Sequence, residues 1–275
     1  MIIPSSPVEF PVAEILGVPV HQVTMEQTIH LIGNLVNSKK SHLIVTLGTE
    51  MIMAVRKKNE LNEILQRASL IVPDGGGIIW AAKRLGKPLM KKLAGIELIE
   101  KICSISGENN WNLFFLGGRP GISEKAIQKL KQKFPSMKAV GAHHGYFNQN
   151  EISSILKKQK IDILFAGMGF PLQEKWILEN IESFKIPVGI GVGGSLDVLS
   201  GVLKRAPEWM IRSNLEWLYR LLQEPRRWKR MMTIPEFMLI ISFLSLTGSK
   251  KGRSTLNAEN LSDTGRTESK PKKGE

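Results

Sequence analysis

A single carboxylate follows an apolar stretch near residue 70 of this 275-residue chain. Residues 69–72 are rich in branched apolar side chains and predict a buried strand, which Pro73 ends; Asp74 and then three glycines, Gly75-Gly76-Gly77, follow. In open α/β sheets, ligands bind beyond the carboxyl ends of the strands. Glycines there let a substrate approach the backbone, and the N-terminus of the next helix favours anions. Asp74 therefore stands where a catalytic carboxylate would, although Asp is also a common helix cap.

Three further segments after predicted strands have residues suited to binding an anion or a sugar. Gly117-Gly118-Arg119-Pro120-Gly121 opens a helix, as a phosphate-binding turn does, and an ordinary tight turn explains it as well. Gln173 lies in the first turn of another helix, where its amide could hydrogen-bond a sugar or phosphate oxygen or cap the helix. The glycine-rich segment 189–194, with Asp197 after it, is a third place where a ligand could approach the backbone.

Two adjacent histidines, His143 and His144, follow a short predicted strand. Neighbouring residues of a strand point to opposite faces, so the two make a poor pair of metal ligands. The sequence contains no cysteine cluster, no His-Glu-x-x-His and no Asp-x-Asp. We therefore expect no metal and no cofactor, and we interpret the histidines as structural or substrate-lining residues.

Strands alternate with helices through the first two hundred residues. Helices are expected over residues 25–36, 50–66, 78–85, 96–105 and 122–134. Strands are expected over residues 14–20, 42–47, 69–72, 112–116, 138–141, 161–166 and 187–191. This order predicts an α/β fold, a mostly parallel Rossmann-like sheet with helices on both faces.

The character of the chain changes after Gly201. Residues 204–230 hold eight Lys or Arg against three Glu, and they include Trp209, Trp217 and Trp228. Pro207 and Pro225 stand where helices could begin. We predict an α/β catalytic domain over residues 1–201, a basic amphipathic helical appendage over 202–246 and a disordered polar tail over 247–275.

The net charge of +13 indicates a polyanionic partner, such as nucleic acid, an anionic membrane or a phosphorylated substrate. No nucleic-acid recognition motif accompanies the basic segment, whereas helices with Trp and Leu opposite Lys and Arg are typical of a bilayer interface. We therefore favour an anionic membrane surface over nucleic acid. The sequence shows no signal peptide and no apolar window of about 20 residues, so we expect no spanning helix. The single cysteine, Cys103, fits a reducing cytoplasm.

Together and in this order, the motifs resemble the TagA/WecG/CpsF family, glycosyltransferase family 26 of bacterial surface-polymer synthesis. The resemblance covers about residues 17–246. It rests on Val72-Pro-Asp-Gly75, Leu93-Ala-Gly95, His143-His-Gly-Tyr-Phe147, Phe170-Pro-Leu-Gln-Glu-Lys-Trp176, Gly191-Val-Gly-Gly194, Lys204-Arg-Ala-Pro207 and residues 215–230.

The resemblance implies an inverting, metal-independent transfer of an N-acetylhexosamine, typically N-acetylmannosamine, from a UDP donor. The implied acceptor is N-acetylglucosamine on undecaprenyl diphosphate, and the implied location is the cytoplasmic face of the bacterial plasma membrane. Asp74 is the implied base, and the appendage is implied to dock on the membrane and close over the diphosphate. The implied substrate-binding residues are Thr46, Lys92, Gln173, Arg220, Arg227 and Arg230. The oligomeric state stays open, a homo-oligomer included.

The sequence departs from the family pattern at three positions. Gly48 replaces an amide, Glu97 replaces an Asp, and Lys92 replaces an arginine, which keeps the charge but loses the bidentate fork. The donor sugar therefore stays open. The alternative function is a binding protein for a sugar nucleotide or a polyprenyl phosphate that is non-catalytic or of altered specificity.

Overall fold

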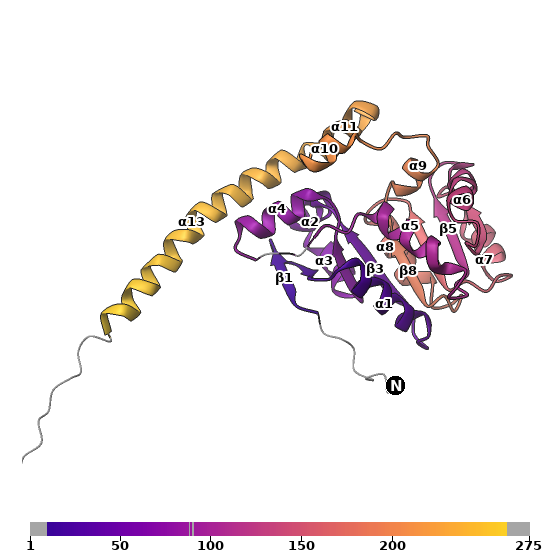
Figure 1. Cartoon of the computed structure of the whole chain (residues 1–275), viewed down its shortest axis with the longest axis horizontal. Coiled ribbons are helices and arrows are strands. Elements are labelled where there is room, and N and C mark those ends of the chain that lie inside the picture. Colours follow the sequence, from indigo (N-terminus) through magenta and orange to yellow (C-terminus); the bar gives the residue numbers. More distant parts are fainter. Residues whose placement is uncertain (1–9, 88, 90, 263–275) are drawn as a thin grey trace, which may run out of the picture.

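The computed structural model describes residues 10–262 except residues 88 and 90, with side chains placed as far as Thr247. Its main sheet has six parallel strands in the order β4-β3-β8-β7-β5-β6 (Figure 1). The strands are β3 (His42–Leu47), β4 (Leu70–Pro73), β5 (Leu113–Gly117), β6 (Ala139–His143), β7 (Ile163–Gly167) and β8 (Val188–Gly191). The expected α/β fold with a mostly parallel sheet is confirmed.

Successive side chains of the strands point to two separate hydrophobic clusters, one on each face of the sheet. Leu43 and Val45 belong to one cluster, and Ile44 between them belongs to the other. One face is covered by α1 (Met25–Val36), α5 (Gly95–Ser106), α6 (Ile122–Lys133) and α9 (Ser195–Leu199). The other is covered by α2 (Thr49–Lys57), α3 (Asn62–Gln66), α4 (Gly76–Arg84), α7 (Gln149–Leu156) and α8 (Leu172–Asn180). Burial on both faces explains the nearly continuous apolar strands.

Two predicted elements near the N-terminus are broken in the structure. Residues 14–20 belong to a hairpin of β1 (Val12–Ile15) and β2 (Val18–His21), which turns at Leu16 and Gly17, both with positive φ. The helix predicted over residues 50–66 is divided into α2, the 3₁₀ turn η1 (Asn59–Leu61) and α3. The division occurs because Lys58 has an extended backbone that ends α2.

The C-terminal appendage consists of helices that follow Pro207 (Figure 1). They are α10 (Glu208–Arg212), α11 (Glu216–Gln223), the 3₁₀ turn η2 (Pro225–Arg227), α12 (Trp228–Met231) and α13 (Thr233–Ser262). Pro207 and Pro225 stand at helix starts, as predicted. The backbone of α13 is helical to Ser262, whereas the sequence predicts disorder from residue 247; residues 263–275 of that predicted tail lie outside the described residues.

Helix α13 presents apolar side chains in two directions. Phe237 and Ile241 are fully buried in the cluster that includes α2 and α4, whereas Leu239 is 72% exposed and Phe243 is 66% exposed. By length and composition, the stretch Pro225–Thr247 is apolar enough to cross a membrane, with a mean hydropathy of 1.3. By this measure of length and hydropathy, the expectation that no stretch is apolar enough to cross a membrane was wrong. One side of the stretch nevertheless packs on the α/β domain.

Candidate active site

A cavity of about 1250 Å³ lies at the carboxyl ends of the strands, between the sheet and the appendage. Residues that follow β3, β4, β5, β7 and β8 line it, which is the edge where ligands bind in such sheets. All seven residues expected at the site line this one cavity: Thr46, Asp74, Lys92, Gln173, Arg220, Arg227 and Arg230. The structure therefore brings together residues that are up to 184 positions apart in the chain, from Thr46 to Arg230.

The three glycines after Asp74 serve three different purposes. Gly75 has φ +90, which residues with a side chain rarely adopt. A Cβ on Gly76 would coincide with the side-chain amide of Asn214 from the appendage. A Cβ on Gly77 would lie 2.6 Å from Cγ2 of Thr49. The turn after Asp74 is therefore held between α2 and the appendage.

Asp74 has a carboxylate of unusually high proton affinity. Burial raises its pKa to about 7, and the negative charge of Glu216 on α11 acts in the same direction. A hydrogen bond with the Gly95 backbone and the charges of Lys92 and Arg220 lower the pKa, and they offset only part of the rise. A carboxylate whose pKa is close to neutral is suited to accept a proton from a hydroxyl at physiological pH.

Polar side chains surround a small space beside the Asp74 carboxylate. A Cβ built on Gly95 would lie 3.6 Å from Asp74 Oδ2, 3.4 Å from Thr46 Oγ1 and 3.2 Å from Ser195 Oγ. Thr46 donates its hydroxyl hydrogen to the Gly191 carbonyl, 2.7 Å away, so its oxygen is left as an acceptor. The missing side chain at position 95 therefore leaves room near the carboxylate.

Gln173 braces two glycine turns instead of pointing a free amide at the cavity. It is 2% exposed, and its Oε1 accepts hydrogen bonds from the backbone nitrogens of Gly169 and Gly193, both at 3.0 Å. Its Nε2 donates to Glu174 at 2.7 Å. The Gln173 amide is therefore hydrogen-bonded within the protein, and because Gln173 also lines the cavity, its contact with substrate stays a prediction. Gln173 fixes the backbone that surrounds the cavity.

The appendage places Arg220 and Arg230 over glycine turns and Arg227 in the same cavity. A Cβ on Gly194 would coincide with the Arg220 guanidinium, and Arg230 Nη1 lies 3.7 Å from the Cβ position of Gly169. Glu224 binds both Arg220, at 3.4 Å, and Arg227, at 2.9 Å. Arg230 pairs with Glu50 of α2.

A buried nitrogen of Arg220 is available to bind a ligand. Arg220 Nη2 is buried and has no hydrogen-bond partner among the described residues. Because buried polar groups are normally hydrogen-bonded, a partnerless guanidinium nitrogen over a glycine turn indicates an anion site.

The positions that depart from the family pattern fall in different places. Gly48 and Lys92 line the cavity, so a change there acts on the site directly. Glu97 instead pairs with Arg205, at 2.7 Å, and does not line the cavity.

Several lining residues were not identified as site residues from the sequence. They are Ser195, Asn214 and Glu216. The sequence also indicated no role for Glu174, which does not line the cavity but accepts a hydrogen bond from Gln173. Asp197 also lines the cavity, and burial raises the pKa of its carboxyl against the influence of Arg220 and Arg227. Ser195 directly follows a glycine pair that the sequence singles out, but no pattern in the sequence shows that Glu216 approaches Asp74.

The two histidines do not follow the strand geometry expected of them. Strand β6 ends at His143, so the alternation of side chains does not extend to His144, and the two rings are 4.2 Å apart. Ligand atoms of His143, His144 and Glu151 lie within 4.8 Å of one another. His144 Nδ1 accepts the Tyr146 backbone N–H at 3.2 Å and is therefore occupied. The absence of a metal from the reaction remains a prediction.

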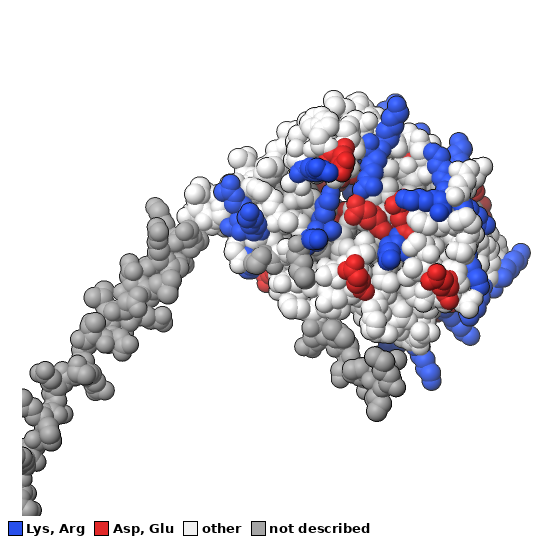
Figure 2. Space-filling model, in the orientation of Figure 1, with Lys and Arg blue, Asp and Glu red and all other residues white. Residues whose placement is uncertain are grey.

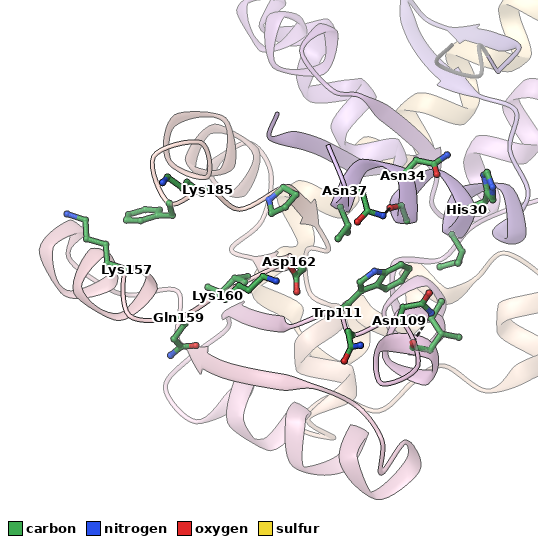
Figure 3. Close-up of a pocket in the computed structure, with 18 residues that line it drawn as sticks. His30, Asn34, Asn37, Asn109, Trp111, Lys157, Gln159, Lys160, Asp162 and Lys185 are labelled. Carbon is green, nitrogen blue, oxygen red and sulfur yellow. Dashed lines mark hydrogen bonds between the residues drawn. The ribbon is translucent and has the colours of Figure 1, made fainter. Parts of the chain in front are cut away.

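A second hollow, of about 910 Å³, lies at the opposite end of the sheet (Figure 3). It is lined by segments that precede β3, β5, β7 and β8, with Trp111, Asp162 and Lys160 near its centre and Lys157 and Lys185 toward one side. None of the expected site residues lines it. The glycine turns that follow the strands are also absent from its lining, so the cavity at the carboxyl ends is the candidate active site.

The basic side chains are spread over the face shown in Figure 2, with acidic side chains between them. A nucleic-acid interface typically gathers Lys and Arg in one patch or stripe. This face has no such stripe. The appendage arginines Arg220, Arg227 and Arg230 instead line the cavity.

Comparison with known proteins gives a consistent result. The model of the glycosyl transferase WecG/TagA/CpsF family matches residues 13–251. A relative from Staphylococcus aureus, named N-acetylglucosaminyldiphosphoundecaprenol N-acetyl-beta-D-mannosaminyltransferase, is 36% identical over 83% of this chain and 91% of its own. A relative of the same name from Bacillus spizizenii is 33% identical over 77% of this chain and 83% of its own. The chain therefore belongs to the WecG/TagA/CpsF family of glycosyltransferases.

Proposed function

We propose that the protein transfers an N-acetylhexosamine, N-acetylmannosamine in the first instance, from a UDP-sugar to N-acetylglucosamine on a polyprenyl diphosphate. The relatives are named for the same acceptor and sugar. The observation that carries the proposal is the single cavity in which Asp74 and three appendage arginines meet. A base and a set of fixed cations are the two functions that this reaction requires.

Asp74 acts as the general base in a single displacement. The acceptor hydroxyl attacks the anomeric carbon of the donor as its proton passes to the Asp74 carboxylate. The bond between the anomeric carbon and the UDP oxygen breaks, and its electron pair leaves with UDP. Attack from the side opposite the leaving group inverts the anomeric configuration.

The leaving diphosphate gains negative charge, and the appendage supplies the cations that stabilise it. The partnerless Arg220 Nη2 over Gly194 is placed to bind a phosphate oxygen, with Arg227 and Arg230 in the same cavity. Because arginine side chains stabilise this negative charge, the proposed reaction needs no metal ion. Gln173 keeps the Gly169 and Gly193 turns in position for the phosphates.

The lipid part of the acceptor accounts for the apolar side chains at the cavity and on the appendage. Trp80, Ile234 and Met238 line the cavity where α4 meets α13. Leu239 and Phe243 are exposed further along α13, and Trp228 is 56% exposed near the arginines. A helix with exposed apolar and basic residues binds an anionic bilayer surface. We therefore propose that the protein docks on the cytoplasmic face of the plasma membrane.

The proposal is tested by incubating the purified protein with UDP-N-acetylmannosamine and a short-chain N-acetylglucosaminyl diphospholipid, and weighing the product. Asp74→Asn should lower turnover by roughly 10²- to 10⁴-fold, because the base is lost, and should leave UDP affinity close to that of the parent. Turnover by the parent should rise with pH through about 7, as the Asp74 carboxyl ionises.

The opposite result has a clear meaning. UDP binding by the parent without product from any of a panel of UDP-sugars would contradict the proposal and favour a sugar-nucleotide binding protein. Equal turnover by Asp74→Asn and the parent would remove Asp74 from its role.

A further inference from the structure

Asn214 connects the appendage to the turn that follows Asp74. Helix α10 ends in a turn in which Leu215 N–H donates to the Met210 carbonyl at 2.8 Å and Asn214 has φ +58. Glycine is the usual residue at this left-handed position, and asparagine is the side-chain-bearing residue that tolerates it best. Here the amide of Asn214 occupies the space over Gly76, where a Cβ would be.

Glu216 follows two residues later and lines the same cavity as Asp74. It begins α11, and Arg220 lies one helical turn further along. The contact of Asn214 with Gly76 thus holds the start of α11, with Glu216, over the cavity that Asp74 lines, and Arg220 lies against Gly194. Three charged side chains act on the pKa of Asp74: Glu216 and Arg220 from α11, and Lys92 from the segment before α5.

We propose that Glu216 is a positioning residue that acts through Asp74, and that the contact of Asn214 with Gly76 seats it there, so that the base is set for proton transfer only when α10 and α11 are seated on that turn. This inference rests on the proposed function, and it adds a role for the appendage that its arginines do not supply. With α10 and α11 away from the turn, Asp74 loses a negative neighbour and part of its burial. Its carboxyl is then a weaker base.

The physical consequence is that closure and proton transfer are coupled. A carboxylate with a pKa near ambient pH is both largely ionised and basic enough to accept a proton. Burial and the charge of Glu216 both raise the pKa of Asp74 to about 7. Movement of α10 and α11 away from the Gly76 turn would lower that pKa, so the acceptor hydroxyl would be activated only when these two helices are in place.

The test is the pH profile of kcat/KM for the full-length protein. Glu216→Gln should move the acid limb to lower pH by about half a unit, which is about a threefold gain in relative rate below the midpoint. Because the effect is electrostatic, the difference from the parent should shrink in high salt. Glu216→Asp, which keeps the charge, should restore the limb toward the parent.

Matched controls separate this effect from general changes in charge and stability. Glu208→Gln removes an exposed carboxylate of the appendage that pairs with Arg212 outside the cavity, and it should leave the limb unchanged. Asn214→Gly keeps the left-handed turn but removes the amide over Gly76, so it should shift the limb in the same direction as Glu216→Gln. Asn110→Gly, at a second asparagine with φ +58 far from the cavity, should not.

A second measurement does not depend on turnover. A water-soluble carbodiimide reacts with the protonated carboxyl, so the pH at which Asp74 loses half its reactivity, read by mass spectrometry, reports its titration directly. This midpoint should fall in both Glu216→Gln and Asn214→Gly. Parental midpoints in both variants would overturn the inference and leave the proposed function standing. Lowered midpoints without any transfer by the parent would defeat the proposed function, and with it the catalytic role of Glu216, while still showing that Glu216 acts on the pKa of Asp74.

Discussion

At the scale of single residues, the least expected feature is a second buried acid beneath the cavity. Glu174 is fully buried, its Oε1 accepts from Gln173, and its Oε2 has no partner in the part of the chain that the structure describes. Burial raises its pKa to about 7. Between about pH 4.5 and 7, the folded protein therefore holds a proton that the unfolded chain has released. Stability falls as pH rises through this window.

We predict that Glu174→Gln removes much of this dependence. A glutamine keeps the acceptor for Gln173 and does not ionise, so the variant should gain stability relative to the parent at pH 8, on the order of 2 kcal/mol, and not at pH 4. Urea unfolding at both pH values measures the difference. Glu179→Gln, an exposed carboxyl of the same helix, is the matched control. Parallel pH dependence in the parent and Glu174→Gln would contradict the prediction.

At the scale of elements, the cavity is made by glycine turns that each receive a side chain from another segment. The Gly194 turn receives Arg220, as the Gly76 turn receives Asn214. Glycine is required at these places because of close approach, in addition to the backbone freedom that Gly75 needs. The turns and the appendage are therefore matched in shape.

Gly194→Ala should displace the Arg220 guanidinium while leaving the strands intact. Losing a charged hydrogen bond to phosphate should weaken UDP binding by about tenfold, measured by calorimetry. A double-mutant cycle identifies the cause, because Gly194→Ala should add little once Arg220→Ala is present. Full additivity of the two changes would show that the alanine acts in some other way.

The sequence predicts the bounds of an element well where the apolar pattern of that element alone determines them. The predicted bounds of α1 and β3 match the structure, since α1 has a regular helical period of apolar residues and β3 is a nearly continuous apolar run. The hairpin at residues 14–20 was missed because Leu16-Gly17 is not one of the common turn pairs. The seven expected site residues do share a cavity, yet the approach of Glu216 to Asp74 was not predicted. That approach depends on how α11 packs on a strand end far away in the chain.

At the scale of the whole molecule, the appendage is both part of the core and a candidate membrane contact. Phe237 and Ile241 complete the core cluster over α2 and α4. Deletion of everything after Gly201 would therefore uncover the core as well as remove the arginines. Loss of activity in that truncation alone would not separate membrane docking from folding.

Substitutions on the exposed side of α13 separate membrane docking from folding. We predict that Leu239→Gln with Phe243→Gln lowers binding to vesicles containing phosphatidylglycerol by tenfold or more, because each lost apolar side chain contributes roughly 1.5–3 kcal/mol when buried. Transfer to a short-chain soluble acceptor should stay near that of the parent. Sedimentation with vesicles measures the first result and product mass the second. Unchanged vesicle binding would place the membrane contact elsewhere.

The two-sided character of α13 has a practical consequence for anyone handling the protein. Its inner side chains keep the helix attached to the domain, so the outer ones cannot fold away and stay in contact with whatever solvent is supplied. In plain buffer, the outer side chains of α13 are removed from water most readily by packing against another copy of the same helix. In detergent, a micelle covers them. We expect the apparent mass in solution to depend on protein and detergent concentration, even though the cavity within each molecule is unchanged.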